Sequence, residues 1–268
     1  MKNAFSVLIA IHQRSDIESN FENLINSIYS NTLLPNQVLV LVDGPIKISF
    51  KNRIKYIQEK RGFEVYFHRE NIGLANILNL GLEKISNNWV IRVDGDDICL
   101  PNRFKKLIDS IKPKISIIGS YIKEIDEKKN TRIKKVPLEQ KNISRYLKYR
   151  NPFNHPSVAF RVDHVLNVGG YPNFYLKEDY GLWVKMISKG YRGINIPEVL
   201  VETFFNKASY NRRSGIGYLK SDIALTFMQY RLKLINIFEF IFILILRSVI
   251  ILSPSFIKIF LYNMLRSI

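Results

Sequence analysis

The alternation of two hydrophobic periods along the first 120 residues constrains the fold of this chain more than any other feature. Short apolar runs rich in β-branched residues are typical of buried strands, and they fall at residues 5–11, 37–42, 63–67, 89–93 and 115–118. The segments between them carry apolar side chains at helical spacing. Unbroken apolar strands separated by amphipathic helices predict an α/β fold with a mostly parallel central sheet flanked by helices. Ligands of such sheets bind outside the carboxyl ends of the strands.

The composition restricts the class of protein further. Hydrophobic residues make up 47% of the 268 residues, which excludes a disordered chain. A single cysteine, Cys99, excludes a disulfide scaffold or a thiolate zinc cluster and suits a reducing compartment. The apolar run at the start is short and is followed by His12-Gln13-Arg14, so a buried first strand is predicted rather than a signal peptide.

The net charge of +17 favours an anionic partner. The candidates are nucleic acid, an anionic membrane surface and a phosphorylated small molecule. The chain has no zinc-finger spacing, no RNA-recognition motif and no long basic run. Charge alone therefore does not choose between these partners.

The pattern after residue 118 is less regular. A surface hairpin is predicted from residues 121–125 and 131–136, joined by a charged turn. Helices are predicted at 138–149 and 179–188, and short strands at 157–161 and 197–203. A further helix is predicted at 216–233.

An acidic cluster, Asp94-Gly95-Asp96-Asp97, directly follows a predicted buried strand. Three carboxylates so close together repel one another, and a hard divalent cation compensates them well. Mg²⁺ and Mn²⁺ take oxygen ligands and bind one or two carboxylates together with a substrate diphosphate. The alternative is an Asp-rich turn that caps the helix predicted to begin near Pro101.

A second acidic pair, Glu178-Asp179, precedes a predicted helix. In one interpretation Asp179 caps that helix and has no further role. In the other it is a general base, since a carboxylate beside a bound metal and phosphate stays ionised and accepts a proton from an attacking hydroxyl.

Motifs in a fixed order extend over about residues 4–205 of the chain. They are the run 5–14, Val42-Asp43-Gly44, Asn71-Ile72-Gly73-Leu74-Ala75 with Asn79 and Gly81, Val93-Asp94-Gly95-Asp96-Asp97-Ile98 before Pro101-Asn102-Arg103, His155-Pro156-Ser157, Gly169-Gly170-Tyr171, and Glu178-Asp179-Tyr180 with Leu182-Trp183. As an ordered set they resemble a family 2 glycosyltransferase with the GT-A fold. The later Arg212-Arg213-Ser214-Gly215 and Tyr218-Leu219-Lys220 resemble enzymes that build bacterial O-antigen, capsule or exopolysaccharide.

The resemblance implies a role for each matching residue. Contacts with a nucleotide sugar donor are expected from His12, Arg14, Asp43, Asn71, Asp94, Asp96 and Arg213. Mn²⁺ or Mg²⁺ is expected at Asp96, with Asp94 holding the ribose or the outer shell of the metal. Asp179 corresponds to the catalytic base, and the acceptor side is expected to include Glu178, His155 and Trp183. His12 stands where the family more often has an aromatic residue, Asn71 has a purely structural alternative, and His155 is equally explained as a turn residue before Pro156.

The implied reaction is inverting transfer of a hexose, with a galactose-type sugar favoured, from a UDP-linked donor. The acceptor would be a saccharide linked to a polyprenyl diphosphate, in bacterial surface polysaccharide synthesis. Residues 1–210 would form the GT-A catalytic domain, with a nucleotide-binding half at 1–97 and an acceptor half at 98–210. Residues 211–268 would form a helical, membrane-associating segment, and Arg212 and Arg213 would either close over the diphosphate or remain solvated.

Residues 234–252 are overwhelmingly apolar. On a helix, Asn236, Glu239 and Arg247 lie within roughly a quarter turn of one another. A polar stripe of this kind favours a helix that lies in the plane of the membrane interface. A second amphipathic segment is predicted at residues 256–265. The location expected is the cytoplasmic face of a bacterial membrane, with its anionic surface as a partner. A true membrane span, or a helix packed on the catalytic domain or a second subunit, are the alternatives.

Two other functions compete with glycosyl transfer. The first is a non-catalytic, basic α/β protein that binds nucleic acid, although no nucleic acid is expected if the resemblance holds. The second is a nucleotidyltransferase on a related fold. The chain lacks the Gly-rich phosphate loop with a nearby lysine that the second would carry after its first strand.

Overall fold

A computed structural model of the chain describes residues 4–205 and 215–253. Within them, the strands are β1 Ser6–Ile11, β2 Gln37–Val42, β3 Glu64–Phe67, β4 Trp89–Asp94, β5 Ile98–Cys99, β6 Ile115–Asp126, β7 Thr131–Lys134, β8 Ala159–Arg161 and β9 Arg192–Phe205. The helices are α1 Ser15–Tyr29, α2 Ile48–Arg61, α3 Leu74–Leu82, α4 Arg103–Asp109, α5 Gln140–Tyr146, α6 Val162–Asn167, α7 Glu178–Ser188, α9 Gly215–Arg231 and α10 Ile237–Leu252, with a 3₁₀ turn η1 at His155–Ser157. The predicted lid at Arg212 and Arg213 and the piece at 256–265 lie outside the described residues.

The strands form one sheet in the order β3-β2-β1-β4-β8-β6-β9-β5, and β7 pairs with β6. The pairs β3-β2, β2-β1 and β1-β4 are parallel, as the apolar runs predict. β8 is antiparallel to both β4 and β6, so β6 and its parallel partner β9 run in the direction of β4. The carboxyl ends of β1, β4, β6 and β9 therefore lie at one edge of the sheet.

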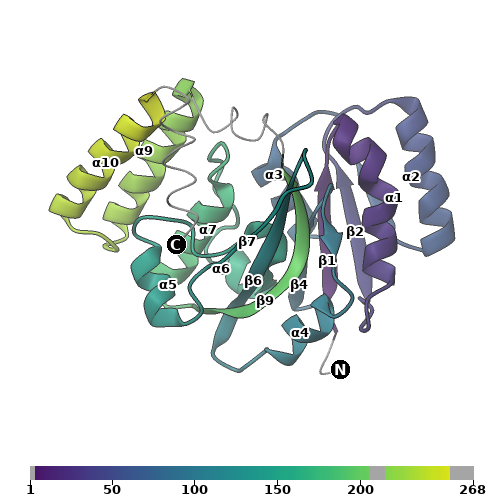
Figure 1. The fold of residues 1–268 in the computed structure, drawn as a ribbon, viewed down its shortest axis with the longest axis horizontal. Helices are drawn as coiled ribbons and strands as arrows, with labels where there is room; N and C mark the ends of the chain where they lie inside the picture. The colour runs from purple at the N-terminus through teal and green to yellow at the C-terminus, as the bar shows by residue number, and fades with distance from the viewer. Residues whose placement is uncertain (1–3, 206–214, 254–268) are drawn as a thin grey trace.

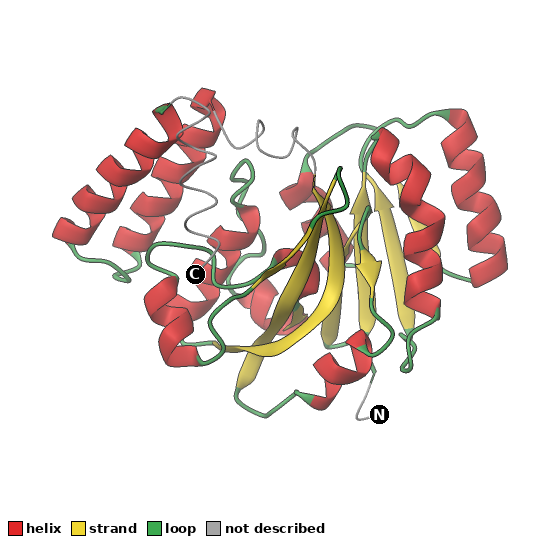
Figure 2. Ribbon diagram, in the orientation of Figure 1, coloured by secondary structure: helices red, strands yellow, loops and turns green. Residues whose placement is uncertain are grey.

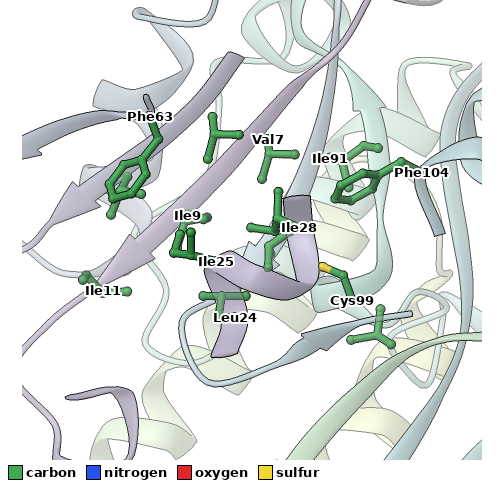
Figure 3. Close-up of a cluster of buried hydrophobic side chains, with 14 of the residues drawn as sticks. Val7, Ile9, Ile11, Leu24, Ile25, Ile28, Phe63, Ile91, Cys99 and Phe104 are labelled. Carbon is green, nitrogen blue, oxygen red and sulfur yellow. The ribbon is translucent and has the colours of Figure 1, made fainter. Parts of the chain in front are cut away.

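Both faces of the sheet are buried at its central strands, which explains why β1 and β2 are almost entirely apolar. Val7, Ile9 and Ile11 of β1 belong to a core with α1, α2 and α4, whereas Leu8 and Ala10 belong to a second core with α3, α5, α6 and α7. Successive residues of a strand point to opposite faces, so one strand supplies both cores. Figure 3 shows the first core, where α1 packs against the sheet, and Figure 2 shows helices on both faces.

The sheet corrects two sequence-based boundaries. The predicted strands at 115–118 and 121–125 are one continuous strand, β6, whose end pairs with β7 and confirms the predicted hairpin. β9 is longer than the predicted 197–203. The two long strands pair along their length, with register shifts between Ser120 and Ile122. Gly119 keeps β6 close to β9, because a Cβ there would meet the Asn195 side chain at 2.1 Å.

The helices α9 and α10 pack side by side at the end of the molecule away from α1 and α2 (Figure 1). The structure confirms the polar stripe that the sequence predicts on α10, but these side chains face the protein. Asn236 and Glu239 form a capping box, Glu239 also pairs with Lys148 at 2.7 Å, and Arg247 is held between α9 and α7. In the described part of the chain, no helix combines the length and the apolar character needed to span a bilayer.

Candidate active site

A cavity of about 480 Å³ opens at the carboxyl edge of the sheet. Its walls come from the ends of β4, β6 and β9, the start of α7, the segment after α5, and the helices α9 and α10. The charged residues that line it are Arg14, Asp94, Asp96, Asp97, Glu124, Lys134, Arg150, Lys177, Glu178, Asp179 and Arg247. This is the edge at which α/β sheets bind ligands.

Asp94 is the last residue of β4, and a buried arginine of the same strand holds its carboxylate. The Nη2 atom of Arg92 lies 2.7 Å from Oδ1 of Asp94. Arg92 is 1% exposed, and its Nη1 atom donates to the carbonyl oxygen of Leu8 at 3.2 Å. Residues two apart on a strand share a face, so this pairing is built into β4 and fixes the orientation of Asp94.

Asp96 lies in the turn after β4 and contacts Arg14, which follows β1. The Nη2 atom of Arg14 lies 3.0 Å from Oδ2 of Asp96, and Arg14 also pairs with Asp16. Burial and the neighbouring Asp94 carboxylate raise the pKa of Asp96 above its ordinary value, against the opposing effect of Arg14. The negative charge at this end of the cavity is therefore only partly compensated by the protein itself.

Asp97 is fully buried beneath this turn. Burial, followed by the charges of Asp94 and Asp96, holds its pKa well above the ordinary value of a carboxyl group. Its Oδ2 atom has no hydrogen-bond partner among the described residues. Asp94 and Asp96, with 32% and 18% of their side chains exposed, are therefore the accessible carboxyl groups of this cluster.

Asp94 and Asp96 fit a divalent cation that is shared with a substrate. Within residues 4–205 and 215–253 there is no group of three or more His, Cys, Asp or Glu residues placed to hold a metal by themselves. Mg²⁺ and Mn²⁺ do not require such a group when a substrate diphosphate completes their oxygen shell. Two carboxyl groups on one cavity wall, whose charge Arg92 and Arg14 compensate only in part, are a suitable protein contribution.

Asp43 follows β2 and braces the loop before α3. Its carboxylate accepts hydrogen bonds from the backbone N–H groups of Ile72 at 2.8 Å and Gly73 at 3.0 Å. Asn71 donates to the Asp43 carbonyl oxygen at 3.2 Å, and His12 is partly exposed just after β1. None of Asp43, Asn71 and His12 lines the described cavity, so a donor contact from these three residues stays a prediction.

Asp179 lies in the first turn of α7 and is oriented by two donors. Nδ2 of Asn151 donates to its Oδ2 atom at 2.6 Å, and the backbone N–H of Tyr180 donates to Oδ1 at 2.7 Å. The positive end of the helix dipole also favours a carboxylate at this position. The carboxylate is partly exposed and lines the cavity that contains Asp94 and Asp96.

Glu178 lies beside Asp179 in a different environment. Its side chain is buried, with 7% exposed. Burial, with a further contribution from the Asp179 charge, raises the pKa of Glu178 to about 8. Two adjacent carboxyl groups thus lie in different environments, since Glu178 is buried whereas Asp179 is partly exposed at the cavity and oriented by Asn151 and Tyr180.

His155 and Trp183, both predicted on the acceptor side, have different positions. His155 lines the cavity, and its Nε2 atom lies 3.2 Å from the hydroxyl of Tyr171. Burial lowers the pKa of His155, so its ring is neutral at pH 7. Trp183 is fully buried and packs edge-on against His155 and Phe153. The structure therefore places Trp183 in the core behind the cavity wall, because the surrounding aromatic rings enclose it.

Asn79 fixes the loop that carries Tyr171. Its amide donates to the Tyr171 carbonyl oxygen at 2.9 Å and accepts from the Tyr171 N–H at 2.8 Å. Gly170 has a φ of +63°, and a Cβ there would lie 2.4 Å from the Asn79 side chain. This contact joins α3 to the loop before α7 and explains the glycine in the Gly169-Gly170-Tyr171 motif.

Sequence reasoning missed four residues of the site. Arg92 interrupts an apolar strand, and that interruption is a signal for a buried ion pair. Asn151 and Lys177 carry no local signal, because each acts on a residue that lies distant in the sequence. Arg247 interrupts the apolar run 234–252, but that interruption predicted a polar stripe at a membrane interface and not a place in the site.

Comparison with known proteins agrees with this architecture. The family described as "Glycosyl transferase family 2" matches residues 6–168. The UDP-Gal:alpha-D-GlcNAc-diphosphoundecaprenol beta-1,3-galactosyltransferase of Escherichia coli is 36% identical over 263 residues, which cover 97% of this chain and 95% of that protein. The amylovoran biosynthesis glycosyltransferase AmsE of Erwinia amylovora is 33% identical over 261 residues, which cover 97% of this chain and 98% of that protein.

Solved structures share the fold at low sequence identity. TarS 1-349 of S. aureus in complex with UDP-GlcNAc has a TM-score of 0.68 and 15% identity, and the match covers 90% of this chain and 70% of that one. The mannosyltransferase PcManGT of Pyrobaculum calidifontis in complex with GDP-Man and Mn²⁺ has a TM-score of 0.61 and 16% identity, covering 85% of this chain and 64% of that one. These likenesses show the GT-A fold. With the family match and the two full-length relatives, they establish that the chain belongs to glycosyltransferase family 2.

Proposed function

We propose that this glycosyltransferase moves galactose from a UDP-linked donor to a saccharide carried on a polyprenyl diphosphate, with inversion at the anomeric carbon. The proposal rests on one observation above all: a single cavity holds the Asp94-Asp96 pair and the oriented carboxylate of Asp179. The 36% identity to the Escherichia coli galactosyltransferase supports the choice of sugar and acceptor.

Asp179 is the base in this proposal. The hydroxyl of the acceptor attacks the anomeric carbon from the face opposite the nucleotide, and Asp179 takes its proton. Asn151 and the Tyr180 N–H hold the carboxylate in place. Positioned general-base catalysis is typically worth about 10²–10⁴-fold in rate.

Asp94 and Asp96 act on the leaving group, which is the diphosphate of the donor. We propose that they hold Mn²⁺ or Mg²⁺, with Asp96 as ligand and Asp94 held by Arg92. When bound, the cation supplies positive charge that stabilises the departing diphosphate. Arg14, which pairs with Asp96 at 3.0 Å, contributes a second positive charge in this proposal.

The two halves of the chain divide these tasks. We propose that residues 1–97 bind the nucleotide and residues 98–210 bind the acceptor, which suits the position of Asp94 and Asp96 on one side and Asn151, His155 and Asp179 on the other. The segment 211–268 is proposed to rest on the cytoplasmic face of a bacterial membrane. Exposed apolar side chains on α10 support this role, notably Phe238 at 81% and Phe242 at 59% exposed.

The test is an assay of sugar transfer with the full chain. UDP-Gal, UDP-Glc, UDP-GlcNAc and GDP-Man are each offered with GlcNAc linked through a diphosphate to a lipid, and the configuration of the product is determined. UDP-Gal should be consumed and give a β-linked galactose. Asp179→Asn should lower the rate by about 10²–10⁴-fold, with donor binding retained.

A matched control is Asp163→Asn. Asp163 is an exposed carboxylate on α6 that pairs with Arg161, away from the cavity. This variant should keep the normal rate. Transfer from none of the four donors, or an undiminished rate for Asp179→Asn, would contradict the proposed function.

A further inference from the structure

A second charged group lines the same cavity and has no part in the reaction described above. Lys177, directly before α7, and Arg247, on α10, both contribute to the cavity wall. They share one carboxylate, Asp222 of α9. The Nζ atom of Lys177 lies 2.5 Å from Oδ1 of Asp222, and the Nε atom of Arg247 lies 3.6 Å from Oδ2.

The charges in this group do not balance. Asp222 is buried, with 4% of its side chain exposed, and Lys177 and Arg247 are largely buried, each with 13% exposed. Within residues 4–205 and 215–253, Asp222 is the carboxylate that forms an ion pair with either cation. Two buried cations against one anion leave a positive charge at the cavity wall, and buried charges without partners are costly.

Both cations remain charged. Burial alone would lower the pKa of Lys177, but Tyr218 and Asp222 hold it above its ordinary value. Burial acts on Arg247 in the same way, and Tyr180 and Asp222 more than offset it, so the pKa of Arg247 is also raised. The excess positive charge is therefore permanent at any physiological pH.

The guanidinium of Arg247 is also held in a fixed orientation. Its Nη2 atom donates to the Tyr149 carbonyl oxygen at 3.0 Å and to the Tyr180 hydroxyl at 3.2 Å, and Nη1 donates to Oγ1 of Thr226 at 3.0 Å. Lys177 and Arg247 line the same cavity as Asp179, the proposed base. A fixed cation next to a reaction centre is suited to an anionic group that belongs to the substrate.

We propose that Lys177 and Arg247 form a subsite for the diphosphate of the acceptor lipid. The inference deepens the proposed function and rests on it. The acceptor sugar would lie at Asp179, its diphosphate at Lys177 and Arg247, and its lipid along the exposed apolar face of α10. The helix α10 thus supplies Arg247 on its inner face and apolar side chains such as Phe242 and Ile245 on its outer face.

The first test is a binding measurement that does not depend on sugar transfer. Geranyl diphosphate is titrated into the full chain by calorimetry in the presence of EDTA, so that no divalent cation can link the diphosphate to Asp94 and Asp96. Arg247→Gln and Lys177→Met should each weaken binding by about tenfold or more, since each removes a charge-assisted contact. Asp96→Asn should bind as tightly as the normal chain.

The control for loss of charge is Arg231→Gln. Arg231 is exposed at the end of α9 and does not line the cavity. Equal weakening by Arg231→Gln would indicate a general effect of net charge and would overturn the proposal. So would binding that is lost in EDTA, or binding that Arg247→Gln leaves unchanged.

The second test separates diphosphate recognition from a purely structural role of the ion pair. Transfer is measured to two acceptors with the same sugar and alkyl chain, one joined through a diphosphate and one through an uncharged ether. Arg247→Gln should raise KM for the diphosphate acceptor by about tenfold or more and change kcat/KM for the ether by less than about twofold. Arg247→Lys should recover part of the loss.

The outcomes distinguish the two proposals. If the variant lowers transfer to both acceptors equally, the pair only clamps α10 onto α7, and the subsite is refuted. If the normal chain transfers no sugar at all but binds geranyl diphosphate through Arg247, the proposed function fails while the anion subsite stands.

Discussion

At the level of single residues, Asp179 and its neighbour Glu178 lie in different environments. Asn151 donates a hydrogen bond of 2.6 Å to Asp179, whereas the Glu178 side chain is buried, with 7% exposed. A hydrogen bond to a charged group is worth about 1.5 kcal/mol or more, or about tenfold in rate. The position of the base therefore depends on a residue outside its own helix.

Asn151→Ala should lower kcat for sugar transfer by about tenfold and leave KM for the donor unchanged, because the base loses its orienting contact. Steady-state kinetics check this result. In a chain that already carries Asp179→Asn, the same substitution should have no further effect. Asn167→Ala, which removes an exposed hydrogen bond to Tyr191, is the matched control and should behave as the normal chain.

Glu178→Gln should change how the stability of the protein depends on pH. Burial raises the pKa of Glu178 from 4.5 to about 8, so between these values the unfolded chain has lost the proton that the folded chain retains. The free energy of unfolding then falls as pH rises, by at most about 1.4 kcal/mol per pH unit. The variant lacks this loss, so its Tm should exceed that of the normal chain at pH 8 and approach it at pH 5.

Thermal unfolding between pH 5 and 9 checks this prediction. Glu198→Gln is the control, because Glu198 is exposed and pairs with Lys106 on the surface. It should leave the pH dependence unchanged. A constant difference in Tm between Glu178→Gln and the normal chain at every pH would contradict the shifted pKa.

At the level of elements, α10 has two faces with separate contacts. Its polar residues bind the protein: Glu239 pairs with Lys148, and Arg247 reaches Asp222, Thr226 and Tyr180. The outer face is apolar and exposed. The sequence predicted a helix in the membrane plane, with the polar stripe of Asn236, Glu239 and Arg247 facing water. In the structure, Glu239 and Arg247 of this stripe hold α10 against the rest of the protein.

Phe238→Ser together with Phe242→Ser should abolish binding to vesicles that contain anionic lipid, because both rings lie exposed on the outer face of α10. Co-sedimentation with the vesicles measures this. The Tm should change little, since neither ring belongs to the core. Ile48→Ser on α2, where the side chain is 71% exposed, removes a comparable apolar surface elsewhere and should not affect binding.

At the level of the whole molecule, the cavity exists only because segments distant in sequence meet at one edge of the sheet. UDP with Mn²⁺ should therefore stabilise the entire fold. At a concentration of 100 times Kd, a ligand adds about 2.7 kcal/mol to the free energy of unfolding, or roughly 5–10 °C in Tm for a chain of this size. Differential scanning calorimetry measures the shift.

Asp96→Ala should remove this shift, and EDTA should remove it from the normal chain. Asp109→Ala, an exposed carboxylate on α4 that pairs with Lys105, should retain it. An equal shift with and without the divalent ion would contradict a metal site at Asp94 and Asp96.

Much of this molecule is determined by local patterns in the sequence. The nearly continuous apolar runs that form β1, β2 and β4 predict a sheet buried on both faces, because such strands have no polar face to turn toward water. The Asp94-Asp96 cluster and the Glu178-Asp179 pair follow from their positions at the end of a strand and at the start of a helix. Each of these acidic groups consists of residues that are neighbours in the sequence, so the sequence alone predicts it.

Tertiary structure decided which of these residues work together. Arg14 reaches Asp96 across 82 positions of sequence, Asn151 reaches Asp179 across 28, and Arg247 reaches Tyr180 across 67. No helical or strand period connects such residues. Trp183 entered the core because aromatic rings from other segments, those of Phe153 and His155, pack against it. The polar stripe of α10 turned inward because a charge that leaves water needs a partner, and the packing of the whole chain supplies one for Glu239 and one for Arg247.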